Sequence, residues 1–174
     1  MKPEAPKHED ERLKIGLHYE DFAEIDPGVV FHGVKTQVIT EEANILYADL
    51  TENPQGFHTD EEKAKGSMYG RPVVNGTLTL GVAVGKCVEG VTLDTLVYNV
   101  GYDKVVFPAP VFPGDEISIT WQKISNRESK SHPDAGIVVL KVDGYKREGG
   151  NFKKVISFER TDLVKKRPVE IPTN

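Results

Sequence analysis

The stretch Val73–Val88, which reads VVNGTLTLGVAVGKCV, decides the fold of this chain. Lys86 is its single charged residue; the stretch is too short to cross a bilayer and too uniformly apolar for a surface helix. A helix that is apolar all round must be buried all round. The stretch therefore predicts a central helix enclosed by the rest of the fold, with Asn75 or Thr77 as its N-cap. Its valines leave a buried strand as the alternative.

Three glycines, Gly76, Gly81 and Gly85, lie within the predicted central helix. Glycine inside a helix costs up to about 1 kcal/mol relative to alanine, so these positions need another explanation. Gly81 and Gly85 are four residues apart and share one helix face. They predict that another backbone packs very close to that face.

The chain after the central helix has a β pattern. Ile117, Ile119 and Trp121 alternate with polar residues, which is typical of a strand with one wet face. Strand-length runs occupy 95–107, 115–125, 136–146 and 152–165. Turn-forming or polar connections separate them at 113–115, 125–136 and 147–151. One buried helix followed by four strands predicts an α+β fold, an antiparallel sheet curled around that helix. Because such a sheet leaves edges that a second copy can pair with, we expect a homodimer or a higher homo-oligomer.

Two elements are predicted before the central helix. The β-branched run 29–39 predicts a strand. Residues 41–51 predict a helix that begins after the N-cap Thr40 and ends before Asn53-Pro54. Its apolar residues share one face: Ala43, Leu46, Tyr47 and Leu50.

Length and composition indicate one globular domain. The chain has 174 residues, 38% apolar and 28% charged, with a net charge of −5. Residues 15–165 form the predicted domain, between a polar arm at 1–14 and a tail at 166–174. There is no basic block, so no nucleic-acid partner is expected, and no apolar run long enough to span a membrane. The polar N-terminus lacks the apolar core of a secretory signal, so a cytoplasmic location is expected.

The sequence offers no metal or cofactor motif, and we expect no cofactor. Cys87 is the only cysteine, and none of the five histidines stands at metal-ligand spacing. His58 has the most informative position, in the irregular overhang 54–72 that leads into the central helix. Thr59 or Asp60 is expected to open a short helix there.

The predicted position of His58 is suited to acid–base chemistry. The N-terminus of a helix presents unpaired backbone N–H groups and a partial positive charge. Such a place can stabilise a carbonyl oxygen that becomes negative during reaction. An imidazole beside it can accept and release a proton near neutral pH.

Five segments together resemble the MaoC-like hydratase/dehydratase family. They are TENPQGFHTD (51–60), YGRPVVNGTLTLG (69–81), FPAPVFPGD (107–115), RESKSHPDAGIV (127–138) and SFERTDLV (157–164). The resemblance covers about 40–165 and implies a hot-dog fold acting on acyl-CoA thioesters. The RESKSHPDAGIV segment is most similar to the branch with mesaconyl-CoA hydratase and β-methylmalyl-CoA dehydratase.

The resemblance implies reversible hydration of a 2-enoyl-CoA, or dehydration of a 3-hydroxyacyl-CoA, with a short branched or dicarboxylic acyl group such as mesaconyl. His58 matches the histidine of the family motif. Asn53 stands where the motif has aspartate, and Asn75-Gly76 stands where it has His-Gly. The backbone near Gly76 would polarise the thioester carbonyl. Asn53 can orient a water molecule but cannot accept its proton.

Further residues have expected roles in the same reaction. Asp60 and Glu52 are carboxylates that could orient His58 or replace it, although Asp60 is also a plausible N-cap. Gln55 and Tyr69 are expected to shape the acyl pocket. Cations that suit the phosphates of CoA are Arg71, Lys104, Arg127 and Lys130.

Two other functions stay open on the sequence. Two asparagines in place of Asp and His are also what a non-catalytic acyl-CoA-binding subunit would carry. Thioester hydrolysis is the weaker alternative, because hot-dog thioesterases usually place a carboxylate on or near the central helix, and Val73–Val88 has none.

Overall fold

The computed structural model of this chain describes residues 16–169. The predicted arm at 1–14 and the end of the predicted tail lie outside the described residues. Lys166 and Arg167 form ion pairs with Glu128 and Asp21. Both residues follow the predicted domain boundary at residue 165.

The chain begins with small elements and ends with long strands. Their order is α1 (Tyr19–Glu24), β1 (Phe31–His32), β2 (Gln37–Val38), α2 (Glu41–Leu50), the 3-10 turn η1 (Gly56–His58), α3 (Glu61–Lys65), α4 (Gly76–Cys87), its π-helical continuation η2 (Val88–Thr92), β3 (Leu96–Val106), β4 (Glu116–Glu128), β5 (Ala135–Glu148) and β6 (Asn151–Lys165). The four predicted strands after the central helix are confirmed, and the β4–β5 connection is shorter than predicted.

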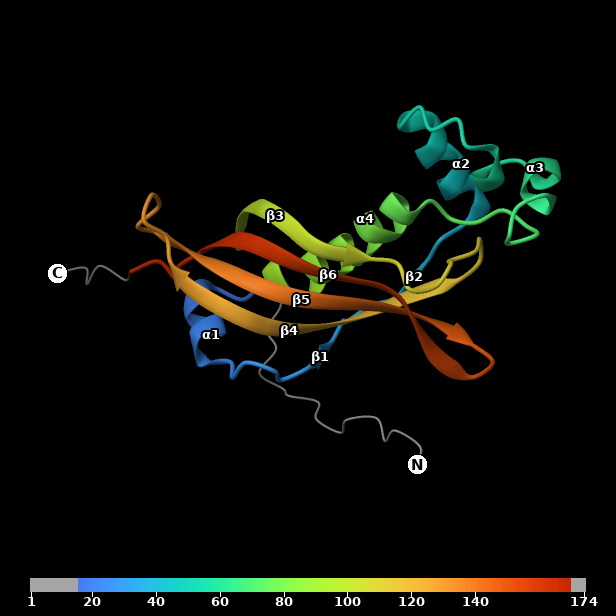
Figure 1. The fold of residues 1–174 in the computed structure, drawn as a ribbon. Helices are drawn as coiled ribbons and strands as arrows, with labels where there is room; N and C mark the ends of the chain where they lie inside the picture. Colours follow the sequence, from blue (N-terminus) through green and yellow to red (C-terminus); the bar gives the residue numbers. More distant parts are fainter. Residues whose placement is uncertain (1–15, 170–174) are drawn as a thin grey trace.

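The strands form one antiparallel sheet in the order β1-β4-β5-β6-β3, and β2 also pairs with β4. Figure 1 shows the sheet curving along α4, with α2 and α3 at one end and the β4–β5 turn at the other. The predicted α+β architecture is therefore confirmed. Strand β3 occupies one edge of the sheet.

The core lies between the inner face of the sheet, α1 and α4. Ile117, Ile119 and Trp121 are 2% exposed or less, as their alternation with polar residues predicts. Phe31 of β1 stacks on Trp121 at 4.4 Å between ring centroids, and Phe22 of α1 meets the same ring edge-on at 6.3 Å. Helix α1, which the sequence analysis did not predict, thus closes the core at one end.

Helix α4 is the predicted central helix, and the cap residue is Asn75. Its buried residues are Thr79, Ala83 and Cys87. The prediction that this helix is buried all round is wrong for the single chain. Gly81 and Gly85 are exposed, and no atom lies within 4 Å of a Cβ placed on either. No helix within residues 16–169 is long and apolar enough to span a membrane.

The prediction of one continuous strand at 29–39 is wrong. The run forms two short strands, β1 and β2, that pair with β4 on either side of a break. Gly33 lies at the break, where its N–H donates to the Ile119 carbonyl at 2.9 Å. A Cβ at Gly33 would come within 2.6 Å of the Ile119 side chain. Close approach at Gly33 therefore accompanies the interruption of the ladder.

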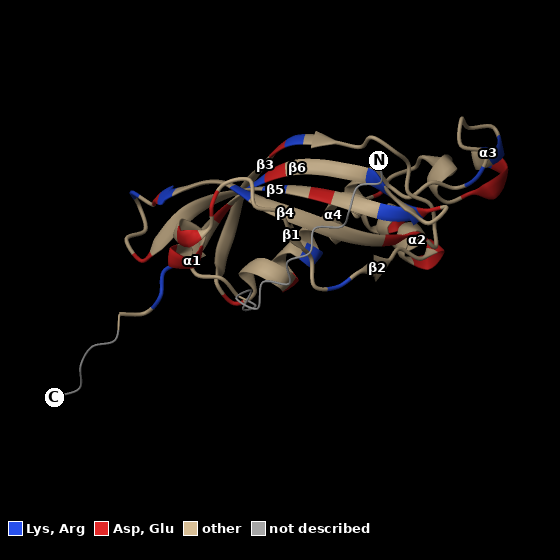
Figure 2. Ribbon diagram, turned by 90° about the horizontal axis from the view of Figure 1, so that it is seen from below, with Lys and Arg blue, Asp and Glu red and all other residues tan. Residues whose placement is uncertain are grey.

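Helix α2 has the predicted cap but not the predicted buried face. The Thr40 hydroxyl accepts the Ala43 N–H at 3.2 Å. Leu46 and Leu50 are 67% and 79% exposed, and α2 packs through its small or polar residues Asn44 and Ala48. As Figure 2 shows, α1, α2 and α3 carry acidic residues, and each has two in its first turn, which suits the positive helix end.

An ion pair between Arg160 and Asp162 is buried under the edge strand β3. Both side chains are 0% exposed, and Arg160 Nε donates to Asp162 Oδ1 and to Asn99 Oδ1 of β3 at 2.8 Å each. Within the described part of the chain, both Nη atoms of Arg160 and Oδ2 of Asp162 lack a hydrogen-bond partner. Burial raises the pKa of the Asp162 carboxyl to about 6, against the opposing pull of Arg160.

The raised pKa of Asp162 makes its contribution to stability depend on pH. Between about pH 4 and 6 the folded state keeps a proton that the unfolded state has released, so this contribution falls as pH rises through that window. The full shift corresponds to about 3 kcal/mol. We expect the free energy of unfolding of the wild type minus that of Asp162→Asn, measured by urea denaturation, to be larger near pH 4 than near pH 7. Equal differences at both pH values would contradict this.

Candidate active site

His58 lies beside the segment that leads into α4. The turn η1 ends at His58, whose N–H donates to the Gln55 carbonyl at 3.0 Å. Its ring Nδ1 lies 2.8 Å from the Val73 carbonyl oxygen. The Val73 N–H in turn donates to the Phe57 carbonyl at 3.2 Å. These contacts place the imidazole against Val73, which is three residues before the first residue of α4. The sequence predicts His58 near this helix end.

The contact with Val73 determines the tautomer of the neutral ring. A carbonyl oxygen can only accept, so Nδ1 must carry the hydrogen that it donates to Val73. The lone pair of neutral His58 is then on Nε2, because only one ring nitrogen is protonated. The geometry assigns Nε2 as the atom that can take a proton from a bound water.

The start of α4 presents a free backbone N–H. Asn75 Oδ1 accepts the Thr77 N–H at 3.0 Å and the Thr77 hydroxyl at 2.6 Å. The Gly76 N–H has no acceptor among residues 16–169. The ring of Phe107 lies 3.4 Å from a Cβ built at Gly76, which is an ordinary van der Waals distance, so Phe107 packs over the start of the helix. An unpaired N–H at a helix N-terminus can receive a developing oxyanion.

The cap also determines which carbonyl is available to His58. Had the helix begun one turn earlier, the Thr77 N–H would donate to the Val73 carbonyl, four residues back. Asn75 Oδ1 takes that N–H instead. The Val73 oxygen is therefore left to side chains, and His58 uses it.

Asn53, Asp60 and Gln55 have local structural bonds in this chain. Asn53 Oδ1 accepts the Gln55 N–H at 3.1 Å, in an Asx turn around Pro54. Asp60 caps α3 by accepting the Lys63 N–H at 3.1 Å, and this bond holds the pKa of its carboxyl below the usual range. Asp60 is thus the predicted helix opener. No hydrogen bond within the described residues joins Asn53, Asp60 or Gln55 to the His58 ring.

Tyr69 and Arg71 gather around Phe112. The Arg71 guanidinium carbon lies 3.7 Å from the Phe112 ring centroid, and Tyr69 meets the same ring edge-on at 6.3 Å. Arg71 has no ion pair within residues 16–169. Arg71 is two residues before Val73, and its stacked guanidinium could bind an anion there.

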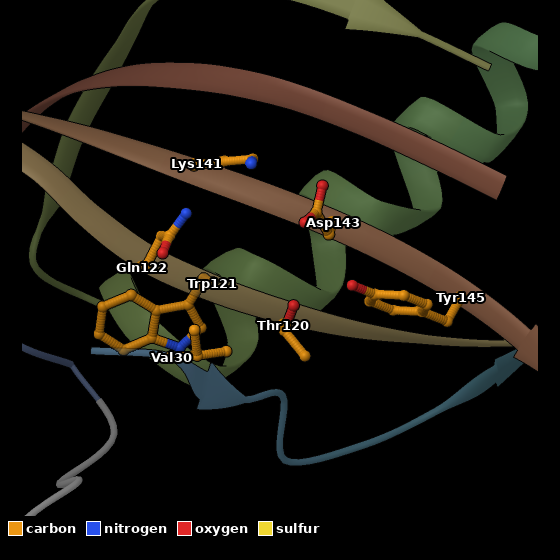
Figure 3. A pocket seen from close by; sticks show the side chains of 7 residues that line it. All are labelled: Val30, Thr120, Trp121, Gln122, Lys141, Asp143 and Tyr145. Atoms are coloured by element: carbon orange, nitrogen blue, oxygen red, sulfur yellow. The ribbon is translucent and has the colours of Figure 1, made fainter. Parts of the chain in front are cut away.

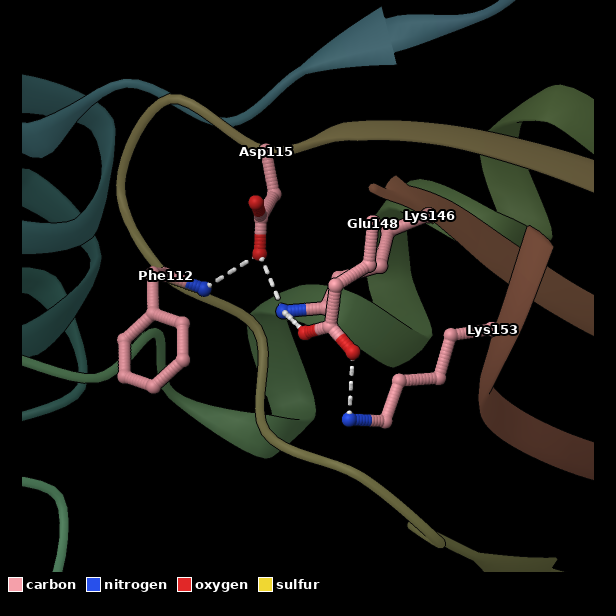
Figure 4. A network of polar contacts seen from close by, with 5 residues as sticks. All are labelled: Phe112, Asp115, Lys146, Glu148 and Lys153. Carbon is pink, nitrogen blue, oxygen red and sulfur yellow. Dashed lines mark hydrogen bonds and ion pairs between the residues drawn. The ribbon is translucent and has the colours of Figure 1, made fainter. Parts of the chain in front are cut away.

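A charged clamp holds the loop that carries Phe112 (Figure 4). The Phe112 N–H and the buried Lys146 ammonium donate to Asp115 Oδ2 at 2.9 and 2.8 Å. Glu148 bridges Lys146, at 3.7 Å, to Lys153, at 2.7 Å. A buried amine needs such a partner because desolvating an unpaired charge is costly.

The clamped loop also touches the start of α4. The Val111 carbonyl accepts the Val74 N–H at 2.8 Å, and Phe107, at the start of the loop, packs near Gly76. The loop from Phe107 to Phe112 thus contacts both the Arg71 guanidinium and the start of α4, where the Gly76 N–H is free.

The other predicted cations lie elsewhere. Lys104 pairs with Glu159 at 2.6 Å on the outside of β3 and β6. Arg127 lies near the end of β4 and Lys130 in the β4–β5 connection, at the opposite end of the sheet from α2 and α3 (Figure 1). Among the described residues, no hydrogen bond or ion pair joins Lys104, Arg127 or Lys130 to His58.

Cys87 is a core residue, as predicted. Burial raises the pKa of its thiol to about 11, so it stays protonated near neutral pH. In the part of the chain that the structure describes, no three His, Cys, Asp or Glu side chains gather in a group that could hold a metal ion.

A depression of about 80 Å³ lies on the outer face of the sheet (Figure 3). Lys141, Asp143 and Tyr145 line it and alternate along β5 with the buried residues Leu140 and Val142. The depression is therefore on the opposite side of the sheet from α4 and is separate from the His58 site.

Sequence reasoning missed two residues of this site, Asn44 and Phe107. Asn44 is fully buried on α2 and bonds to the backbone of His58, Val73 and Asn75. Nothing in the pattern of residues 41–51 distinguishes it from a surface asparagine. Phe107 begins the segment FPAPVFPGD, whose only signal in the sequence is the family resemblance.

A curved antiparallel sheet along a central helix defines a hot-dog-type protein, and His58 beside the helix start is its candidate acid–base residue. Solved structures support the fold. A MaoC-like dehydratase from Rhodospirillum rubrum is 27% identical with a TM-score of 0.72, covering 88% of this chain and all of that one. A Mycobacterium tuberculosis protein described as a double hot-dog fold is 17% identical with a TM-score of 0.73, covering 91% of this chain and 47% of that one.

The family model described as "MaoC like domain" matches residues 23–145, and the chain belongs to this family. Over 85 residues it is 34% identical to a mesaconyl-CoA hydratase of Haloarcula marismortui, and over 87 residues 36% identical to 3-hydroxyacyl-thioester dehydratase Z of Mycobacterium tuberculosis. Each match covers 47% of this chain. The matches span 23% and 56% of those two relatives.

We expect His58 to be the Nδ1–H tautomer when neutral, because Nδ1 donates to Val73. Long-range ¹H–¹⁵N correlation spectra of ¹⁵N-labelled protein above neutral pH report which ring nitrogen is protonated, and His58→Gln assigns the signal. His32, exposed on β1, is the matched control, and its spectrum should show the mixture of both tautomers expected for a solvated imidazole. An Nε2–H tautomer at His58 would overturn the orientation described here.

Proposed function

We propose that this chain catalyses reversible addition of water to the double bond of a 2-enoyl-CoA thioester. One observation carries the proposal: the His58 ring is held through Nδ1 on Val73, three residues before the unbonded N–H of Gly76. This arrangement offers a base and an oxyanion donor at the same short segment, the start of α4. Membership in the MaoC-like family and the hydratase and dehydratase names of its relatives support the same reaction.

In the proposed mechanism, His58 Nε2 takes a proton from water as the water oxygen attacks Cβ of the enoyl group. Negative charge moves to the thioester oxygen, where the Gly76 N–H stabilises the enolate. The imidazolium then returns a proton to Cα, so water has been added across the double bond and the ring is neutral again. Dehydration is the same path in reverse.

The other predicted polar residues have smaller parts in this proposal. Asn53 keeps a side-chain N–H that can hold the attacking water, while its oxygen belongs to the Asx turn. Asp60 is engaged as a helix cap. His58 is therefore the proposed base, with Asn75 shaping the helix start.

For the acyl group, we propose a short branched or dicarboxylic chain such as mesaconyl. The support is the similarity to a mesaconyl-CoA hydratase and the Arg71 guanidinium, which stacks on Phe112 without an ion-pair partner in the described chain. A guanidinium binds a carboxylate in bidentate fashion. Tyr69 and Gln55 are the proposed walls of the acyl pocket.

We expect His58→Ala to lower kcat about 10²–10⁴-fold on the preferred substrate, because a general base contributes about that factor. The assay follows loss of the conjugated-thioester absorbance of crotonyl-CoA and mesaconyl-CoA. The melting temperature should stay near the wild-type value, since His58 is only partly buried.

The matched control is His32→Ala, which changes an exposed histidine on β1 and should leave turnover unchanged. Unchanged turnover in His58→Ala would remove His58 from the mechanism. A wild type that binds both thioesters without turnover would instead be a non-catalytic acyl-CoA-binding subunit. Release of free CoA thiol would indicate hydrolysis.

We also propose that two copies pair through the edge strand β3. Its solvent-facing residues include apolar side chains that are 37–54% exposed: Val97, Tyr98, Val100, Tyr102 and Val106. Gly81 and Gly85 leave the exposed face of α4 open to close packing. Pairing of β3 with its copy would continue the sheet and satisfy its free edge.

Val100→Lys should convert the dimer to a monomer, because a charge on a paired edge strand opposes association. Sedimentation equilibrium measures the change. Leu50→Lys, on the exposed face of α2, is the control and should leave the dimer intact. A wild type that sediments as a monomer would contradict the proposed pairing.

A further inference from the structure

Asn44 bonds to three backbone positions of the proposed site, at His58, Val73 and Asn75. It is 0% exposed and belongs to α2. Its Nδ2 donates to the His58 carbonyl at 2.8 Å and to the Val73 carbonyl at 3.3 Å. Its Oδ1 accepts the Asn75 N–H at 2.9 Å. The amide orientation is determined by these partners, since two are acceptors and one is a donor.

These three bonds fix the relation between the base and the helix start. The Val73 oxygen accepts from both Asn44 Nδ2 and His58 Nδ1, so Asn44 holds the group on which the imidazole is oriented. The bond to the His58 carbonyl fixes the backbone of the histidine itself. The bond from Asn75 leaves the Gly76 N–H as the first free donor of the segment.

The residues of α2 around Asn44 indicate that this side chain serves hydrogen bonding and not apolar packing. The helix exposes Leu46 and Leu50 and turns a buried amide toward η1 and α4. An apolar residue at position 44 would leave two carbonyls and one N–H without this partner, and unsatisfied buried polar groups are destabilising. The hydrogen-bonding capacity of Asn44 is matched to backbone groups of the site.

We propose that Asn44 is a positioning residue, which sets the orientation of His58 relative to the free N–H of Gly76 without touching substrate. The expected effect on catalysis rests on the proposed function, but the expected effect on the orientation of His58 does not. A misplacement of about 1 Å in an active site can lower the rate about 10²-fold. Loss of Asn44 should therefore affect the chemical step rather than substrate binding.

The test uses two variants, Asn44→Ala and the volume-conserving Asn44→Leu. The control is Val138→Ala, which removes buried apolar atoms from β5 and should lower stability without changing a residue of the site. In the Asn44 variants we expect kcat to fall about 10–100-fold, KM to stay within about threefold, and the His58 spectrum to show mixed tautomers. Val138→Ala should keep the wild-type kcat and the Nδ1–H tautomer at a comparable loss of melting temperature.

A folded Asn44 variant with wild-type kcat and an unmixed Nδ1–H tautomer would overturn the proposal. If neither Asn44 variant folds, hydrogen exchange in the wild type decides: the Asn75 N–H and the Asn44 side-chain amide should be protected, and rapid exchange of both would overturn it. If the wild type turns over no enoyl-CoA, the proposed function fails. The tautomer and exchange results would then still show whether Asn44 orients His58.

Discussion

The site depends on the Val73 carbonyl oxygen, which accepts hydrogen bonds from His58 Nδ1 and from Asn44 Nδ2. This oxygen lies just outside α4, and the Asn75 cap leaves it without a helical partner by taking the Thr77 N–H. The cap of the helix and the orientation of the histidine are therefore coupled, because the Asn75 cap leaves the Val73 oxygen free for the His58 ring. If the helix began one turn earlier, the Gly76 N–H would be used in a helical hydrogen bond and the Thr77 N–H would compete for the oxygen that orients the ring.

Local chemistry made much of the fold predictable. The caps Thr40, Asp60 and Asn75 each bond to a backbone N–H two or three residues ahead, so short-range sequence contains the signal. The long strands were predictable from alternation and turns. The break near Gly33 was not, because it accompanies a close contact with Ile119 of β4, and the two lie 119 − 33 = 86 positions apart in sequence.

The site was predictable in part, for the same reason. His58 could be placed near the helix start because it lies in the overhang that leads into that helix, and the family resemblance supported it. Asn44 could not be placed, because its role arises from which face of α2 packs inward. Periodicity favoured the face with Leu46 and Leu50, yet a large apolar face would hold α2 away from the backbone groups that Asn44 reaches.

The error about α4 has a different physical origin. An apolar pattern records which surfaces are removed from water in the functional state, and it does not say which chain removes them. Within one chain α4 buries the row Thr79, Ala83 and Cys87 and leaves Gly81 and Gly85 open, while β3 exposes apolar side chains at a free edge. Both features would be costly in an isolated monomer and are accounted for together if a second copy covers them. Under the proposed pairing, the apolar pattern of the sequence describes burial in the dimer and not in the single chain.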